Sequence, residues 1–178
     1  MAARIPLHLL IRDLLLIAAT LGLWAWSRQL DLGGGTLAIA VAVAAGTMTA
    51  VCGYLIHEWG HLTGALLRGS VVELPHSVRA VFLFKFNSEV NSRKQFLWMS
   101  LGGFIASAVV VALLFALLSP QRLADQVALG LTVAGVAATL ILEVPPALKV
   151  YRGAELPRGV AYSGAPATPQ GGPQAPTR

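Results

Sequence analysis

The chain has 178 residues, of which 56% are hydrophobic and 12% are charged, and its mean hydropathy is +0.69. A water-soluble domain carries roughly 25% charged residues, so this composition excludes an ordinary soluble enzyme and, for most of the chain, intrinsic disorder. The formal net charge of +5 does not indicate nucleic-acid binding, because the basic residues flank long apolar runs. The composition predicts an integral membrane protein whose surroundings are a lipid bilayer.

Four apolar segments are long enough to cross a hydrocarbon layer, which takes about 20 helical residues. In chain order they cover about residues 9–27, 37–67, 96–118 and 127–148. Arg12 and Asp13 interrupt the first, for which a signal peptide is the alternative interpretation; it is disfavoured because no small-residue cleavage site follows. We expect an all-α membrane protein in which residues 1–152 form the membrane domain. Residues 153–178, rich in Pro, Gly and Ala, are expected to form a disordered cytoplasmic tail.

The connection between the second and third segments has a different composition. Val71–Leu74 and Val81–Phe86 are rich in β-branched and aromatic residues, and Pro75 lies between them. This pattern is typical of a short hairpin or a re-entrant pair of strands. The alternative is an interfacial loop whose phenylalanines enter the headgroup layer.

The basic residues predict the orientation of the chain. Eleven of the thirteen Lys and Arg residues lie before the first segment, between the second and third, or after the fourth. Four spans place these three regions on one side of the membrane, and only Arg28 and Arg122 fall on the other. By the positive-inside rule, we expect a multi-pass protein of the cell membrane with both termini in the cytoplasm.

The second apolar segment contains the pattern H-E-x-x-H, formed by His57, Glu58 and His61. Histidines four residues apart lie on one face of a helix and can bind one metal ion, and the intervening glutamate is close enough to exchange a proton with a water there. This is the arrangement of zinc hydrolases, with Zn²⁺ as cofactor and Glu58 as catalytic base. Such side chains are costly inside a membrane helix unless they are paired or ligated, and the alternative is a set of core histidines with hydrogen-bond partners.

A catalytic zinc usually takes a third protein ligand. Of the eight acidic residues, only Glu58 and Glu143 lie well inside an apolar segment, so Glu143 is the candidate. His61 precedes Arg68 by seven residues and Glu143 precedes Lys149 by six, which places both about 10 Å below the basic markers. The alternative is an interfacial carboxylate that pairs with Lys149 or Arg152.

The residues from His57 read His-Glu-Trp-Gly-His, with Ala65 and Gly69 following at intervals of four. They resemble the H-E-x-G-H-x-x-x-A-x-x-x-G motif of the site-2 proteases, which are intramembrane zinc metallopeptidases. The resemblance covers about residues 37–149 and is specific only at this motif. The later motifs depart from the family: Leu101–Ser107 lacks the usual Gly-Pro and Asn, and Leu142-Glu143-Val144 stands where the family has Leu-Asp-Gly.

The resemblance implies a zinc metalloendopeptidase that cleaves membrane-anchored proteins near the cytoplasmic face. Control would come from a membrane partner or from self-association. The rival hypothesis is a catalytically inactive membrane protein whose metal site serves structure or partner binding. A transporter or channel is disfavoured, because the four segments contain no repeated halves.

Overall fold

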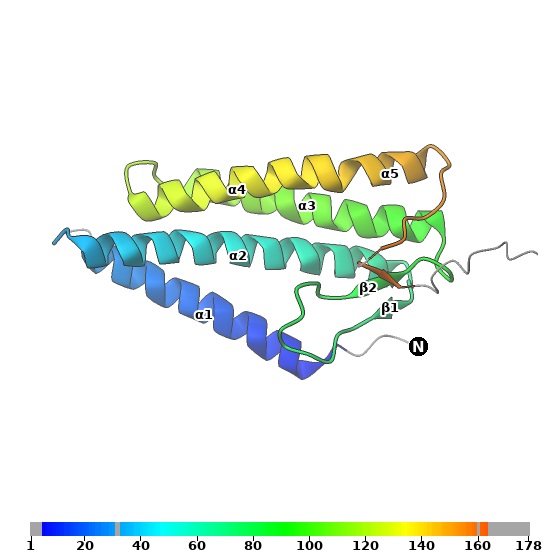
Figure 1. Cartoon of the computed structure of the whole chain (residues 1–178), viewed down its shortest axis with the longest axis horizontal. Coiled ribbons are helices and arrows are strands. Elements are labelled where there is room, and N and C mark those ends of the chain that lie inside the picture. The colour runs from blue at the N-terminus through cyan, green and yellow to red at the C-terminus, as the bar shows by residue number, and fades with distance from the viewer. Residues whose placement is uncertain (1–4, 31–32, 160, 164–178) are drawn as a thin grey trace, which may run out of the picture.

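The computed structural model of the chain describes residues 5–30, 33–159 and 161–163. Its elements, in chain order, are α1 (Leu7–Leu30), α2 (Thr36–Leu67), β1 (Val72–Glu73), β2 (Lys85–Asn87), α3 (Arg93–Leu117), α4 (Leu123–Leu142), α5 (Val144–Tyr151) and β3 (Tyr162–Ser163). Figure 1 shows α2, α3 and α4 running side by side, α1 inclined to them, and the strands gathered near the end of α2, at the end of the bundle where α5 also lies. The mainly helical fold predicted from the composition is confirmed.

Four helical stretches are long and apolar enough to cross a membrane: Leu7–Leu30, Thr36–Leu67, Arg93–Leu117 and Leu123–Tyr151. Many of their large apolar side chains point outward; Leu113 is 53% exposed and Ile141 is 71% exposed. A soluble protein does not leave such continuous apolar surfaces in water. The helices are therefore compatible with a multi-pass membrane protein, and their limits lie within a few residues of those predicted.

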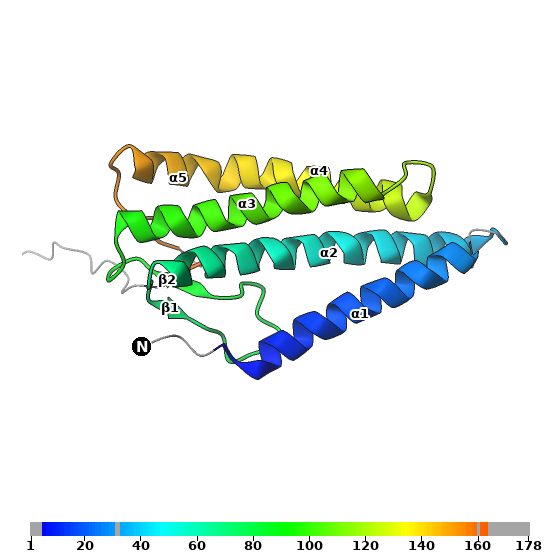
Figure 2. The same ribbon diagram turned by 180° about the vertical axis from the view of Figure 1, so that it is seen from behind.

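Helix α2 occupies the centre of the bundle, between α1 on one side and α3 and α4 on the other, as the two opposite views agree (Figures 1 and 2). Small residues allow α2 and α3 to approach closely. A Cβ on Gly60 would lie 2.5 Å from the Ala106 Cβ, and a Cβ on Gly102 would overlap the Gly60 carbonyl. This close approach brings the backbone of α3 against the face of α2 that carries the two histidines.

The predicted strand pair is present, with different limits. β1 and β2 pair antiparallel, with Val72 opposite Phe86. The predicted strand Val81–Phe86 is wrong over its first four residues, since β2 begins only at Lys85. In the preceding residues, backbone groups have partners outside the sheet. The Tyr54 hydroxyl donates to the Val81 carbonyl at 3.2 Å, and the Leu83 N–H donates to the Glu58 carboxylate at 3.1 Å.

The described part of the chain beyond α5, in the region predicted to be a disordered tail, contains one short strand. Tyr162 and Ser163 form β3, which pairs with β2 in parallel. A strand of two residues gains its order from a distant partner, which local composition does not reveal. Residues 164–178 lie outside the described residues.

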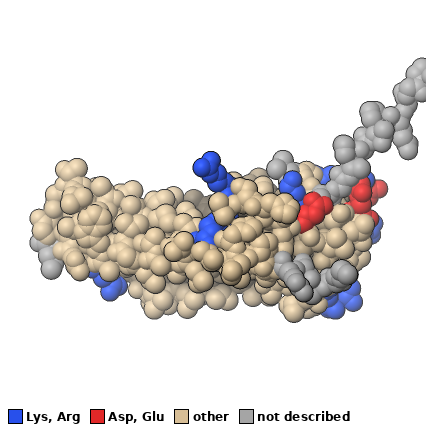
Figure 3. All heavy atoms as spheres, turned by 90° about the horizontal axis from the view of Figure 1, so that it is seen from below, with Lys and Arg blue, Asp and Glu red and all other residues tan. Residues whose placement is uncertain are grey.

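Charged side chains are distributed unevenly along the bundle. In the view of Figure 3, the visible Asp and Glu side chains and most of the Lys and Arg side chains lie toward the end that bears the strands, and only scattered basic side chains lie near the middle and over the opposite half. The apolar faces of the helices and this charged end are the pattern expected when one end of a bundle meets a membrane surface.

Candidate metal centre

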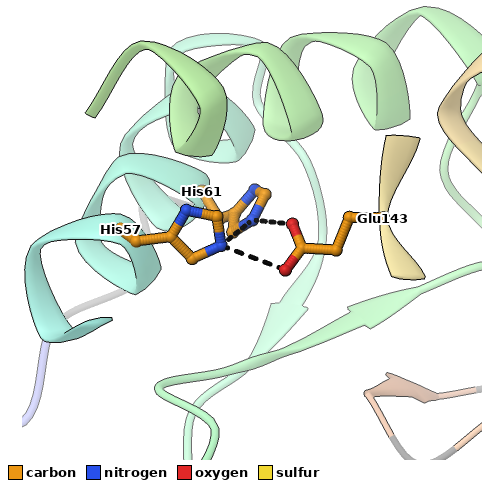
Figure 4. A group of neighbouring side chains, drawn as sticks. All are labelled: His57, His61 and Glu143. Carbon is orange, nitrogen blue, oxygen red and sulfur yellow. Dashed lines mark hydrogen bonds and ion pairs between the residues drawn. The ribbon is translucent and has the colours of Figure 1, made fainter. Parts of the chain in front are cut away.

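The histidines of α2 and the glutamate after α4 come together in one cluster (Figure 4). The Nε2 atoms of His57 and His61 are 2.9 Å apart. The carboxylate of Glu143 lies against both rings, with Oε1 3.2 Å from Nε2 of His57 and Oε2 3.1 Å from Nε2 of His61. One ligand atom from each of the three residues lies within 4.8 Å of the others.

The opposite nitrogen of each imidazole faces the backbone of α3. Nδ1 of His61 lies 2.9 Å from the Met99 carbonyl oxygen, and Nδ1 of His57 lies 3.1 Å from the Gly103 carbonyl oxygen. A carbonyl oxygen only accepts, so each Nδ1 is the donor and carries a proton. In the neutral tautomer, each Nε2 then presents a lone pair toward Glu143.

Two lone pairs and a carboxylate thus converge without a proton between them. Acceptors at such separations repel one another unless a cation lies among them or one imidazole takes up a second proton. Two histidines and one carboxylate, with the outer histidine nitrogens bonded to backbone carbonyls, form a common ligand set for a divalent metal. The observed separations are close to the ~3.3 Å expected between ligands of a tetrahedral zinc. The residues present therefore fit a metal ion.

Glu143 reaches the cluster from the junction between α4 and α5. It is the single residue between the end of α4 and the start of α5, with φ −108° and ψ −36°. Pro145 and Pro146 follow in the first turn of α5, where they cannot donate to the preceding carbonyls. The carboxylate contacts the two imidazoles, whereas the alternative interpretation paired it with Lys149 or Arg152.

Glu58 lies beside the cluster and outside it. Its side chain is buried, and its Oε2 accepts a hydrogen bond from the Leu83 N–H at 3.1 Å. It lines a cavity of about 140 Å³ together with His61 and Glu143. The chain segment before β2 therefore holds the Glu58 carboxylate in place next to the histidines.

A second cavity, of about 280 Å³, lies on the other side of the cluster. Its walls come from α2, α3 and α4; they include His57 and Glu143 and are otherwise mainly small and apolar. Glu143 and Leu142 line both cavities. The cluster is thus reached from two directions, from the strands and from between the apolar helices.

Gly103 leaves room for the His61 ring. A Cβ built on Gly103 would overlap the imidazole, which the Met99 carbonyl already holds in place. We expect Gly103→Ala to shift His61 and to weaken divalent-metal binding about 10- to 100-fold, measured by competition with a chelator. Gly130→Ala on α4 is the control, because a Cβ there meets nothing within 4 Å. Equal metal affinity in the two variants would contradict this role for Gly103.

A second polar network, not predicted from the sequence, anchors α1 to the site region. The Trp59 indole N–H donates to the buried Asp13 carboxylate at 2.7 Å, and Arg12 pairs with the other carboxylate oxygen at 2.7 Å. Arg12 also donates to the carbonyls of Val78 and Ala80. A charged pair inside an apolar segment is the available sequence signal, but it does not identify Trp59 as the partner.

Removal of the Asp13 carboxylate should destabilise the bundle. Asp13→Ala leaves the Arg12 charge and the Trp59 N–H without their partner, so we expect a loss of about 2–4 kcal/mol in the free energy of unfolding. Thermal unfolding in detergent measures this as a lower Tm. Asp13→Asn keeps an acceptor for Trp59 and should lose less; equal stability of wild type and Asp13→Ala would exclude an anchoring role.

Comparison with known proteins identified no relative of this chain. The chain matches no protein-family model, no curated protein and no solved structure.

Proposed function

We propose that this protein is an intramembrane zinc metalloprotease that cleaves membrane-anchored proteins. The observation that carries the proposal is the convergence of His57, His61 and Glu143 through acceptor atoms, beside the buried carboxylate of Glu58. The apolar helices around the cluster support a membrane location for the reaction. The H-E-x-x-H pattern supports peptide hydrolysis over other uses of a metal.

His57, His61 and Glu143 would hold the zinc, which when bound supplies Lewis-acid polarisation of the scissile carbonyl and lowers the pKa of water. Glu58 accepts a proton as the water oxygen bonds to the carbonyl carbon, and it returns the proton to the nitrogen as the C–N bond breaks. The Leu83 N–H orients the Glu58 carboxylate for this transfer. The carbonyls of Met99 and Gly103 hold the two imidazoles in one tautomer.

The substrate must present an extended segment, because a helix hides its carbonyls in its own hydrogen bonds. The sheet beside the 140 Å³ cavity supports binding of such a segment by strand addition. The cavity between α2, α3 and α4 supports an approach from within the membrane. The distribution of basic residues supports a cytoplasmic position for the strand-bearing end and for both termini.

The second candidate is an inactive membrane protein that uses the same metal site for structure or partner binding. It is favoured by a departure from the site-2 protease motif: this chain has Glu143 followed by Val144, where the family usually has Asp followed by Gly. Both candidates require a bound metal, and only the protease requires Glu58.

Metal content and trapping test the proposal together. Protein purified in detergent should contain about one zinc per chain by elemental analysis. A Glu58→Gln variant expressed in native membranes should retain a membrane-anchored protein that the wild-type protein cleaves after purification. Zinc-free protein would exclude the protease and the structural-metal candidate alike; stoichiometric zinc without Glu58-dependent cleavage would favour the second candidate.

A further inference from the structure

The end of the described chain returns to the sheet beside the metal centre. β3 lies parallel to β2, with Tyr162 opposite Phe86 and Ser163 opposite Asn87. The Phe86 N–H donates to the Ala161 carbonyl at 3.3 Å. β2 is the middle strand, and β3 covers the edge that β1 leaves open. An open edge of this kind is where an extended peptide adds to a sheet.

The approach to β3 is held by contacts of its own. The Ser88 hydroxyl donates to the Pro157 carbonyl at 2.8 Å, and Leu156 packs against the core formed around Phe86 and Phe96. The Tyr162 ring lies 6.1 Å from the Phe96 ring, measured between centroids. The position of β3 therefore depends on the Tyr162 ring and on the segment that precedes the strand, in addition to the backbone pairing with β2.

β3 and the residue before it also line the cavity that adjoins the candidate metal centre. Ala161 and Tyr162 line the same 140 Å³ space as Glu58, His61 and Glu143. Burial raises the pKa of the Tyr162 phenol, and the nearby negative charge of the Glu143 carboxylate raises it further. A segment of the protein's own chain thus lies where an extended substrate would have to enter.

We propose that the segment Ala161–Ser163 is an intramolecular occupant of the peptide-binding edge of β2, which a substrate must displace before cleavage. This inference rests on the proposed function. A pairing of two residues is weak, so the strand can leave the edge without unfolding the bundle. Its tether nevertheless gives it a millimolar effective concentration, which a substrate in the same membrane must overcome.

A disulfide across the paired strands tests the position and the effect of β3. In a Cys52→Ala background, the pair Asn87→Cys with Ser163→Cys joins register partners. The pair Glu73→Cys with Ser163→Cys is separated by two strand spacings, about 9.6 Å, and by a further offset of two residues along the strands. Only the first pair falls within disulfide reach, so only it should cross-link on mild oxidation. Oxidation should reduce cleavage of fluorescein-labelled casein, an unfolded probe, at least tenfold, and reduction should restore it.

Release of the strand should have the opposite effect. Tyr162→Ala removes the ring that packs on Phe96, and if the wild-type edge is free in about one-tenth of molecules, cleavage at low casein concentration rises up to tenfold. Tyr151→Ala is the matched control, because Tyr151 on α5 is 75% exposed. Metal content and Tm of both variants show whether the fold and the site are intact.

The outcomes separate this inference from the proposed function. Failure of the Asn87–Ser163 pair to cross-link, or Glu58-dependent cleavage that neither the disulfide nor Tyr162→Ala changes, would overturn the inference alone. Absence of Glu58-dependent cleavage in wild type and in Tyr162→Ala would overturn the proposed function and, with it, the inhibitory role of the strand.

Discussion

Glu58→Gln is expected to reduce cleavage of a membrane-anchored substrate at least a hundredfold while the metal content stays at that of the wild type. The amide keeps the size of the side chain and can still accept from the Leu83 N–H, but it cannot take up a proton from water. General-base catalysis by a positioned side chain contributes about 10²- to 10⁴-fold, which sets this magnitude. Single-turnover cleavage and elemental analysis of the same preparation provide the two measurements.

Glu73→Gln is the matched control for the loss of a carboxylate. Glu73 lies on β1, is exposed, and does not line either cavity at the metal centre. Its replacement should leave both cleavage and metal content unchanged. Cleavage by Glu58→Gln at more than one-tenth of the wild-type rate would remove Glu58 from the role of base, and a loss of metal would instead place it among the ligands.

Replacement of a ligand should remove the metal and the activity together. His61→Ala and Glu143→Ala each leave two of the three converging groups, and we expect zinc to fall from about one to less than about 0.1 per chain after dialysis. Cleavage should fall at least as far as in Glu58→Gln, because the zinc and its ligands act as one unit. Zinc content is measured after gel filtration in detergent, with circular dichroism as the check on helical structure.

Two further variants distinguish ligation from a general structural effect. His76→Ala removes an exposed histidine from the loop between the strands and should retain full zinc. Glu143→Asp keeps the carboxylate but shortens its reach by one methylene, so we expect weaker binding that excess zinc restores. Full zinc in Glu143→Ala would show that two histidines and another group hold the metal, and Glu143 would then revert to a hydrogen-bonding partner of the imidazoles.

The Glu58 and Glu143 replacements change different parts of the candidate site, so their effects on cleavage and on metal content can be distinguished. Glu58 is held by the chain segment before β2, whereas Glu143 is held by the junction of α4 and α5. A change at Glu58 leaves the cluster of His57, His61 and Glu143 in place. A wild-type protein that cleaves, together with a Glu58→Gln variant that retains zinc and no longer cleaves, is therefore specific to a protease, and the structural-metal candidate does not predict this difference between the two proteins.

Much of the candidate site could be predicted from the sequence because it depends on local periodicity and on the cost of charge in an apolar segment. The spacing of His57 and His61 places both on one face of any helix. Glu143 was identified because carboxylates deep in such a segment are rare, and the structure brings it to both imidazoles. The four apolar helices likewise follow from runs of residues long enough to cross a bilayer.

The tertiary structure alone decided which groups complete the surroundings of that cluster. The carbonyls of Met99 and Gly103, the Leu83 N–H on Glu58 and the pairing of β3 with β2 are contacts of backbone groups, which every residue carries and no composition distinguishes. The side chains in the sequence indicate which groups must be buried and which must be paired, because burying an apolar group is strongly favourable and burying an unpaired charge is strongly unfavourable. Backbone partners depend on how distant segments pack, and so the tautomers of the histidines, the orientation of Glu58 and the position of the C-terminal strand emerged only from the folded chain.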